Sequence, residues 1–379
     1  MKLLSNLINT KILSSINELK KETNEILKTQ IFIDNISEPI YEIKNNNIES
    51  LIDSRGYGFF SFGKGFEEAI KKNEHKNGFY VYLGLNEIDL DNIFFDSSDS
   101  DNSLLRSIKM KSKKFNFFNN TYVNQYFDVT FKNETIVKMI GESLNGSINI
   151  DQTNFIKINL NNTEFDFNGI DLAQSNLPSD INNISLRFIG KNIRTDGDII
   201  QDIDFYLLRN KNVLTIDNIN INSQRLKIGP NSDSQKAYIS YNNKLDLYKI
   251  KGKYRLDNSS GYFNNLSKYK FNFFDTDINI QWNNLDYLKN LEGKLNFLIK
   301  DLNLDADITE STFLRALRIL NLNAIIEGLD DVSDNTLNIN RASGEIILGK
   351  NRALIESPII FETDEASLKW VGEVNKNSQ

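Results

Sequence analysis

The chain has 379 residues, of which 40% are hydrophobic and 25% are charged, a balance typical of a folded protein rather than a disordered one. It contains no Cys and one His, which excludes disulfides, thiolate metal sites and the familiar Ser-His and Cys-His catalytic arrangements. The formal net charge is −7 and no basic face with interleaved aromatic residues is visible, so no nucleic-acid partner is expected. Asn is used heavily, which we attribute to an AT-rich genome.

Residues 1–30 predict an amphipathic helix, because Leu4, Ile8, Ile12 and Ile16 recur along one helical stripe. No window of the sequence reaches 18 uninterrupted apolar residues, and polar residues interrupt the start, so neither a transmembrane helix nor a signal peptide is predicted. We expect this helix to pack on the domain. The alternative is a helix that lies on a membrane surface.

The remainder of the chain predicts strands, because short stretches alternate apolar and polar residues. The apolar run from Phe79 to Leu83 predicts a buried strand, and residues 96–103 predict an acidic exposed loop. The alternating positions are Phe127, Val129 and Phe131; Ile156, Ile158 and Leu160; Ile184, Leu186 and Phe188; Ile203, Phe205 and Leu207; Ile278, Ile280 and Trp282; Leu337 and Ile339; Ile346 and Leu348; and Leu368, Trp370 and Val374. Their irregular spacing favours an antiparallel meander over a solenoid. A boundary near residue 180 would separate a first β lobe, 31–180, from a second, 181–379.

The stretch 293–323 changes its period and predicts a strand that runs into a helix. Leu295, Phe297 and Ile299 alternate with polar residues, and after a slip of phase Leu302 and Leu304 continue the strand. A short amphipathic helix follows at about residues 308–321, with Phe313, Leu314, Leu317 and Leu320 at helical spacing. This order predicts a curved sheet with an apolar inner face, one end of which the helix closes.

The residues that could carry chemistry are few. The only His, His75, lies in a polar stretch and is expected to be a solvated loop residue. The segment Gly58–Gly65 fits the first seven positions of a phosphate-binding loop, but Gly65 stands where a hydroxyl is needed, so we expect a hairpin with aromatic residues on one face. The Asp residues within 96–103 lack the Gly and Glu of an EF-hand. The sequence therefore predicts no catalytic residue, no metal and no cofactor.

The C-terminal half resembles the AsmA-like family of envelope proteins, closest to the C-terminal region of its YhdP branch. The resemblance is strongest from about residue 245, and a weaker similarity extends upstream to about residue 50. The motifs that carry it are Ile280-Gln281-Trp282, Leu291-Glu292-Gly293-Lys294-Leu295, the stretch Leu314–Leu322, Ser343-Gly344-Glu345 and Val371-Gly372-Glu373. The Gly and Pro that the family has after Trp282 are replaced here by Asn283, Asn284 and Leu285.

The resemblance implies an elongated, twisted antiparallel sheet that curls into an apolar groove, and a role in phospholipid transport between inner and outer membranes. It implies a periplasmic, membrane-associated location and a part in outer-membrane biogenesis. Members of this branch are far longer and carry an N-terminal transmembrane helix. We therefore expect this chain to work with a membrane-anchored partner or a missing N-terminal part.

The function that we predict from the sequence is a non-enzymatic envelope protein that holds or conducts phospholipid acyl chains along a hydrophobic β-groove. The candidate groove residues are Phe271, Phe273, Ile278, Ile280, Trp282, Leu295, Phe297 and Ile299. Two alternatives remain open at this point. One is a structural or adhesive β-rich surface protein without lipid cargo, and the other is an enzyme acting on envelope polysaccharide. The sequence does not say which face of the sheet is the groove.

Overall fold

A computed structural model describes most of the chain. The described residues are 2–5, 28–34, 37–72, 75, 77–89, 104–117, 120–165, 183–195, 198–230, 236–257, 269–283, 290–305, 336–364 and 367–375. The chain divides into two compact units, Met1–Ser175 (unit 1) and Asn176–Gln379 (unit 2). This division falls close to the boundary expected near residue 180. The described part is mainly β and largely antiparallel, and none of its helices is long and apolar enough to cross a membrane.

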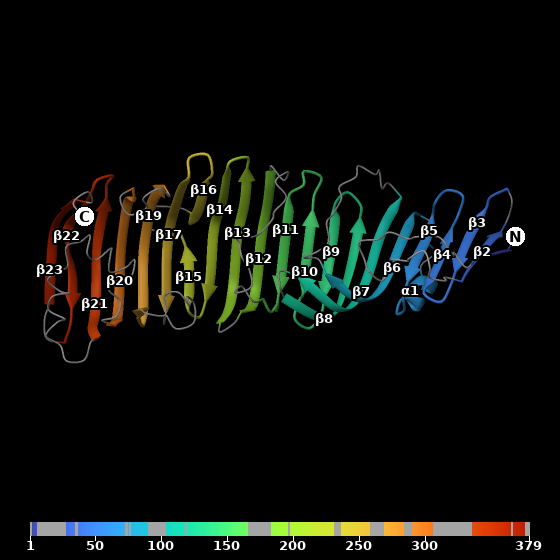
Figure 1. The fold of residues 1–379 in the computed structure, drawn as a ribbon, viewed down its shortest axis with the longest axis horizontal. Coiled ribbons are helices and arrows are strands. Elements are labelled where there is room, and N and C mark those ends of the chain that lie inside the picture. The colour runs from blue at the N-terminus through green and yellow to red at the C-terminus, as the bar shows by residue number, and fades with distance from the viewer. Residues whose placement is uncertain are drawn as a thin grey trace. The chain divides into compact units, whose positions relative to one another are not determined.

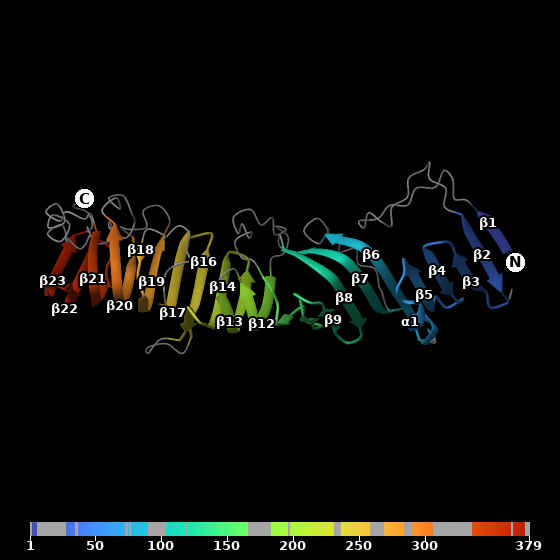
Figure 2. The same ribbon diagram turned by 90° about the horizontal axis from the view of Figure 1, so that it is seen from below.

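Unit 1 carries a mixed sheet whose strands lie side by side in chain order (Figure 1). The strands are β1 (Lys2–Ser5), β2 (Thr29–Asp34), β3 (Ile40–Lys44), β4 (Ile48–Ile52), β5 (Gly58–Phe62), β6 (Phe79–Asp89), β7 (Leu105–Phe117), β8 (Asn120–Phe131), β9 (Thr135–Ile140), β10 (Gly146–Ile150) and β11 (Ile156–Asn161). The pairs β5–β6 and β6–β7 are parallel, and the other recorded pairs of this unit are antiparallel. Helix α1 (Glu67–Lys72) lies between β5 and β6 in the sequence and packs beside β5 (Figure 2).

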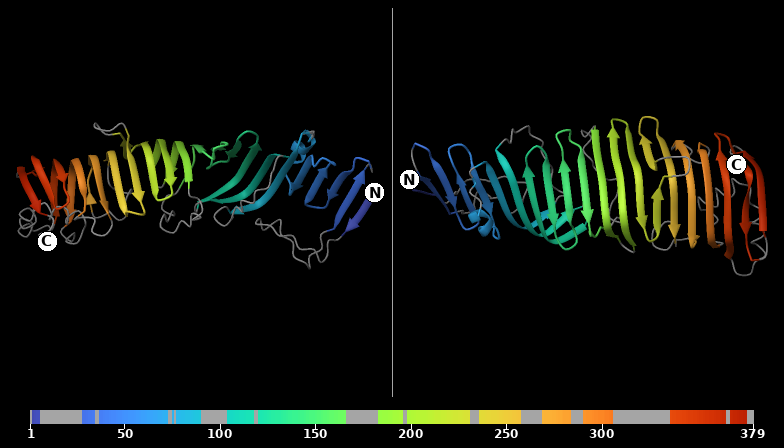
Figure 3. Two further views of the ribbon diagram at one scale, coloured as in Figure 1. Left: turned by 90° about the horizontal axis from the view of Figure 1, so that it is seen from above. Right: turned by 180° about the vertical axis from the view of Figure 1, so that it is seen from behind.

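Unit 2 carries an antiparallel sheet of long strands (Figures 1 and 3). The strands are β12 (Asn183–Thr195), β13 (Asp198–Asn210), β14 (Val213–Ser223), β15 (Leu226–Gly229), β16 (Tyr238–Asn242), β17 (Leu247–Asp257), β18 (Tyr269–Lys270), β19 (Phe273–Asn283), β20 (Glu292–Asp305), β21 (Thr336–Leu348), β22 (Arg352–Glu362) and β23 (Ser367–Asn375). The short strands β15 and β16 share one position in the sheet, because both pair with β14 and with β17.

The N-terminal segment differs from the helix expected over residues 1–30. Residues 2–5 form β1, which pairs antiparallel with β2, so that Leu4 lies opposite Gln30 and is 71% exposed. Residues 6–27 lie outside the described part of the chain. The difference has a simple cause, because the edge of β2 offers backbone hydrogen bonds that outweigh a weak helical preference.

A cluster of buried apolar side chains lies at the C-terminal end of unit 2. This core cluster consists of Ile299, Leu302, Ile339, Ala342, Ile346, Ala353, Ile355, Ile359 and Phe361. Its members come from β20, β21 and β22, whose cross-strand register places Ile299 opposite Ala342 and Leu302 opposite Ile339. Apolar residues of neighbouring strands therefore meet on one face of the sheet.

Left-handed residues keep the apolar side chains of long strands on one face. Asp301, with φ of 52°, lies between Ile299 and Leu302, which are 6% and 3% exposed. Two residues three positions apart would face opposite sides of a regular strand, and the left-handed residue reverses that alternation. Asn192 and Asn218 are also left-handed, with φ of 52° and 54°. Asn and Asp adopt this conformation more readily than other side chains, so it explains the slip of phase in the sequence.

Substitution at Asn218 tests this role, since its side chain is exposed and its backbone is left-handed. Asn218→Gly should leave the free energy of unfolding close to that of the wild type. Asn218→Val should have a free energy of unfolding about 1–2 kcal/mol lower than that of Asn218→Gly, because a β-branched residue fits a φ above zero poorly. Urea unfolding of the full chain measures both. Asn220→Val, at an exposed position of the same strand with ordinary φ, is the matched control and should be close to neutral. Equal losses for the two Val variants would contradict the assignment.

Candidate functional site

Six of the eight candidate groove residues lie together on one face of unit 2. They are Ile278, Ile280 and Trp282 on β19, and Leu295, Phe297 and Ile299 on β20. The register pairs Ile278 with Leu295, so the two rows of side chains are neighbours across the sheet. We call this surface, from β17 to β21, the apolar face.

The apolar face continues beyond β19 and β20. On β17, Ile250 lies opposite Ile280 and Tyr248 lies opposite Trp282. On β21, Ile346 lies opposite Leu295. Ile299 and Ile346 belong to the buried core cluster, whereas Ile278, Ile280, Trp282, Leu295 and Phe297 are only half-buried. The face thus offers accessible apolar surface next to a closed core.

The two remaining groove candidates lie elsewhere. Phe271 lies before β19 and packs against the core cluster, its ring centroid 5.9 Å from that of Phe274. Phe273 lies on the opposite face, where the Arg255 guanidinium carbon is 4.7 Å and the Lys300 Nζ is 5.3 Å from its ring centroid. Phe273 shares the odd-numbered alternation of Asp275 and therefore does not join the other candidates. The helix residues Phe313, Leu314, Leu317 and Leu320 lie outside the described part of the chain.

Sequence reasoning missed the contribution of β17. Its segment, LYKIKGKYRLD, alternates strictly, and a basic residue occupies every second position from Lys249 to Arg255. On the apolar side, Tyr248 stacks between Tyr241 and Trp282, with ring centroids 4.4 and 5.3 Å apart. Three aromatic rings from β16, β17 and β19 thus form a ladder at one end of the apolar face.

Tyr254 is a polar exception on the apolar side of β17. Its hydroxyl is buried and has no hydrogen-bond partner among the described residues, and burial raises the pKa of Tyr254 to about 12. The neighbouring Thr276 is buried too, but its hydroxyl donates to the backbone oxygen of Asn296 at 2.8 Å. The phenol therefore stays neutral, and the apolar face carries no charge at this position.

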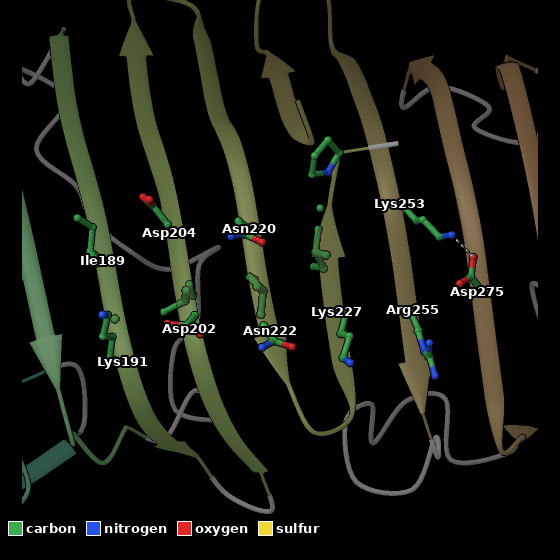
Figure 4. Close-up of a pocket in the computed structure, with 16 residues that line it drawn as sticks. Ile189, Lys191, Asp202, Asp204, Asn220, Asn222, Lys227, Lys253, Arg255 and Asp275 are labelled. Carbon is green, nitrogen blue, oxygen red and sulfur yellow. Dashed lines mark ion pairs between the residues drawn. The ribbon is translucent and has the colours of Figure 1, made fainter. Parts of the chain in front are cut away.

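The opposite face of unit 2 is polar and is hollowed into a shallow cavity of about 680 Å³ (Figure 4). Strands β12, β13, β14, β15, β17 and β19 line it, and the labelled side chains include Lys191, Asp202, Asn220 and Lys227. Lys253 lies 3.4 Å from Asp275 in this cavity.

Further ion pairs follow the same face. Arg187 binds Asp204 through two contacts of 3.0 and 2.7 Å, and this bond raises the pKa of Arg187. Lys294 lies 2.9 Å from Glu345. Such exposed pairs contribute little stability, but their hydration keeps this face in water. The two faces of unit 2 therefore have opposite chemistry.

The Gly-rich segment of unit 1 joins β5 to α1, and the chain then returns as β6 parallel to β5. The hairpin predicted within Gly58–Gly65 is not formed, because this segment holds one strand, β5, and the connection to α1; β5 pairs antiparallel with β4. The Gly65 amide donates to the Glu67 carboxylate at 3.1 Å, and the Lys111 Nζ donates to the Gly65 oxygen at 2.7 Å. The Gly65 amide is therefore already hydrogen-bonded to a carboxylate of the same segment, an arrangement that does not suit the binding of a phosphate.

The prediction that His75 is a solvated loop residue is wrong. His75 is 8% exposed, and its Nε2 lies 3.1 Å from the Tyr82 hydroxyl. Its ring centroid is 4.7 Å from that of Phe59 and 5.2 Å from that of Tyr80. The polar neighbours in the sequence favoured an exposed position, whereas in the structure His75, with a backbone φ of 51°, has its imidazole among aromatic rings.

Comparison of the chain with protein-family models, with characterised proteins and with solved structures found no significant match to any of them. The resemblance to the AsmA-like family therefore rests on the sequence patterns alone and stays a prediction. What the site offers chemically is an uncharged apolar surface backed by a charged, hydrated one.

The buried His75 makes the stability of unit 1 depend on pH. Burial lowers the pKa of His75 from its ordinary value of 6.5, so below that value the unfolded chain binds a proton that the folded chain does not. The contribution of this group is complete about one pH unit above the ordinary pKa of 6.5, and stability should fall as the pH drops through that value, from about 7.5 to about 5.5. Urea unfolding of the wild type and of His75→Gln across this window measures the effect. The variant should lose much of the slope, and identical slopes would contradict the assignment.

Proposed function

We propose that this protein holds or conducts phospholipid acyl chains along the apolar face of unit 2, without catalysing a reaction. The observation that supports this proposal is the separation of the two faces across β17, β19 and β20. On β19, Ile278 and Ile280 are apolar, whereas Asp277 and Asn279, which alternate with them along the strand, are polar. The apolar face can bury acyl chains away from water, and the polar face can stay hydrated.

The energetics of lipid transfer favour such a surface. Each methylene removed from water gains about 0.8 kcal/mol, so a two-chain lipid carried through water without cover would cost tens of kcal/mol. Side chains of Leu, Ile and Phe remove most of that cost. Because they offer few hydrogen bonds, an acyl chain can move from strand to strand, about 4.8 Å at each step, without a deep trap.

The shape required is a sheet curled into a groove with the apolar face inside. Right-handed twist of long antiparallel strands supports this part of the proposal, because it bends a sheet away from planarity. The lipid headgroup would remain in water at the open side. The charged face outside would keep the protein dissolved between the membranes.

The cellular setting of the proposal comes from the resemblance to the YhdP branch. By that resemblance, the protein would act in the periplasm or cell envelope, in association with membranes, and would take part in outer-membrane biogenesis. Attachment to a membrane would come from an anchored partner or from a further N-terminal part. A structural or adhesive β-rich protein without lipid cargo is the alternative that the experiment distinguishes.

Native mass spectrometry followed by lipid extraction from the purified chain tests the proposal. We expect phospholipid to co-purify with the wild type, and Ile280→Asp together with Phe297→Asp should lower the bound lipid about tenfold or more, because a carboxylate is costly beside acyl chains. Asn279→Asp together with Asn296→Asp, on the other face of the same strands, is the matched control and should retain lipid.

Circular dichroism shows whether each double variant remains folded. A folded wild type that carries no lipid and takes up no fluorescent phospholipid from vesicles would contradict the proposal and favour the structural alternative. Equal lipid loss in both double variants would also contradict it, because the effect would then not belong to one face.

A further inference from the structure

Strand β23 forms one edge of the sheet in unit 2. It pairs with β22 on one side, and the recorded registers of the described residues join β23 to no other strand. The strand has 9 residues, SLKWVGEVN, and contains no Pro. Leu368 and Val371 are 47% and 56% exposed. A long edge strand without Pro, and with exposed apolar residues, is a template for pairing with another strand.

The sequence of β23 is complementary to itself. If two copies pair antiparallel about Val371, then Val371 faces its own counterpart and Lys369 faces Glu373 of the second copy. Opposite charges that face each other across strands stabilise the pair, and two such contacts arise by symmetry. In one copy, Lys369 and Glu373 are both exposed, and Glu373 lies 3.4 Å from Arg352 on the side of β22.

The same register places Trp370 opposite Gly372 of the second copy. Gly372 has φ of +150°, and among the described residues nothing lies within 4 Å of the position that its Cβ would occupy. An aromatic ring on one strand can cover a glycine on the neighbouring strand. The open space beside Gly372 therefore fits the indole of a second copy, which is an observation independent of the charges.

We propose that β23 is the interface of a symmetric dimer, in which two copies of this chain continue one sheet through their edges. A two-fold axis perpendicular to the sheet leaves the same face of both copies on the same side. The side that carries Trp370 would thus continue into the corresponding side of the second copy. This inference does not depend on lipid binding. If the proposed function holds, the dimer also joins two apolar faces.

Light scattering after size-exclusion chromatography of the full chain tests the dimer. The wild type should elute with twice the chain mass of 43.6 kDa. Lys369→Glu places two carboxylates opposite each other, and Glu373→Lys places two ammonium groups opposite each other, so each change should weaken the dimer about tenfold or more. The double variant, Lys369→Glu with Glu373→Lys, restores both pairs and should restore the dimer.

A cross-link tests the register. The chain has no Cys, so Val371→Cys introduces the only thiol. A residue that faces its counterpart has a Cα separation of about 4.5–5.5 Å, within the range of a disulfide. Val371→Cys should therefore form a covalent dimer on mild oxidation. Leu368→Cys, displaced from its counterpart by roughly 20 Å along the strands, and Ile140→Cys, at an exposed strand position of unit 1, should not.

Four results would overturn the inference. The first is a wild type that remains monomeric at every concentration. The second is a failure of the double charge variant to recover the dimer that the single variants lose. The third is a cross-link that forms as readily at residue 140 as at residue 371. A series of higher oligomers in place of a dimer would also overturn it, because a head-to-tail contact does not close.

Discussion

The structure depends on one constraint, which is that successive side chains of a strand point to opposite faces of the sheet. In unit 2 this constraint is obeyed over long strands, so Ile, Leu and Phe gather on one side while ion pairs occupy the other. Where a strand is too long for regular alternation to suit its sequence, a left-handed residue such as Asp301 restores the apolar side chains to their face. Core packing and the proposed lipid surface both follow from this arrangement.

The same constraint gives several of the many Asn residues a structural role. Composition alone suggested only a biased genome. In the structure, Asn124, Asn192 and Asn218 take left-handed conformations within strands, a role for which Asn is among the best side chains. A tendency of the genome toward Asn and a requirement of the sheet for left-handed residues therefore act in the same direction. This account covers these positions and not the exposed runs of Asn.

Period-two patterns were sufficient to predict the strands around Ile278, Leu295 and Ile346, and the mainly-β class is confirmed by the described residues. Local patterns could not reveal which backbone edge a segment joins, so the strand at Lys2–Ser5 and the parallel return after α1 were not foreseen. They also placed Phe273 with residues of the other face and His75 in solvent. Tertiary contacts outweighed the local sequence at Lys2–Ser5, in the parallel return and at His75, whereas the alternation along β19 already sets Phe273 on the face of Asp275.

The central claim is that lipid contacts one face of β19 and avoids the other. Site-specific photocrosslinking tests it most directly, with a photoreactive residue at Ile278 in one protein and at the adjacent Asn279 in another. After illumination with phospholipid vesicles, mass spectrometry of the digested protein would identify any adduct. The account predicts a phospholipid adduct at residue 278 and little at residue 279. Equal labelling at both positions, or labelling at residue 279 alone, would contradict it.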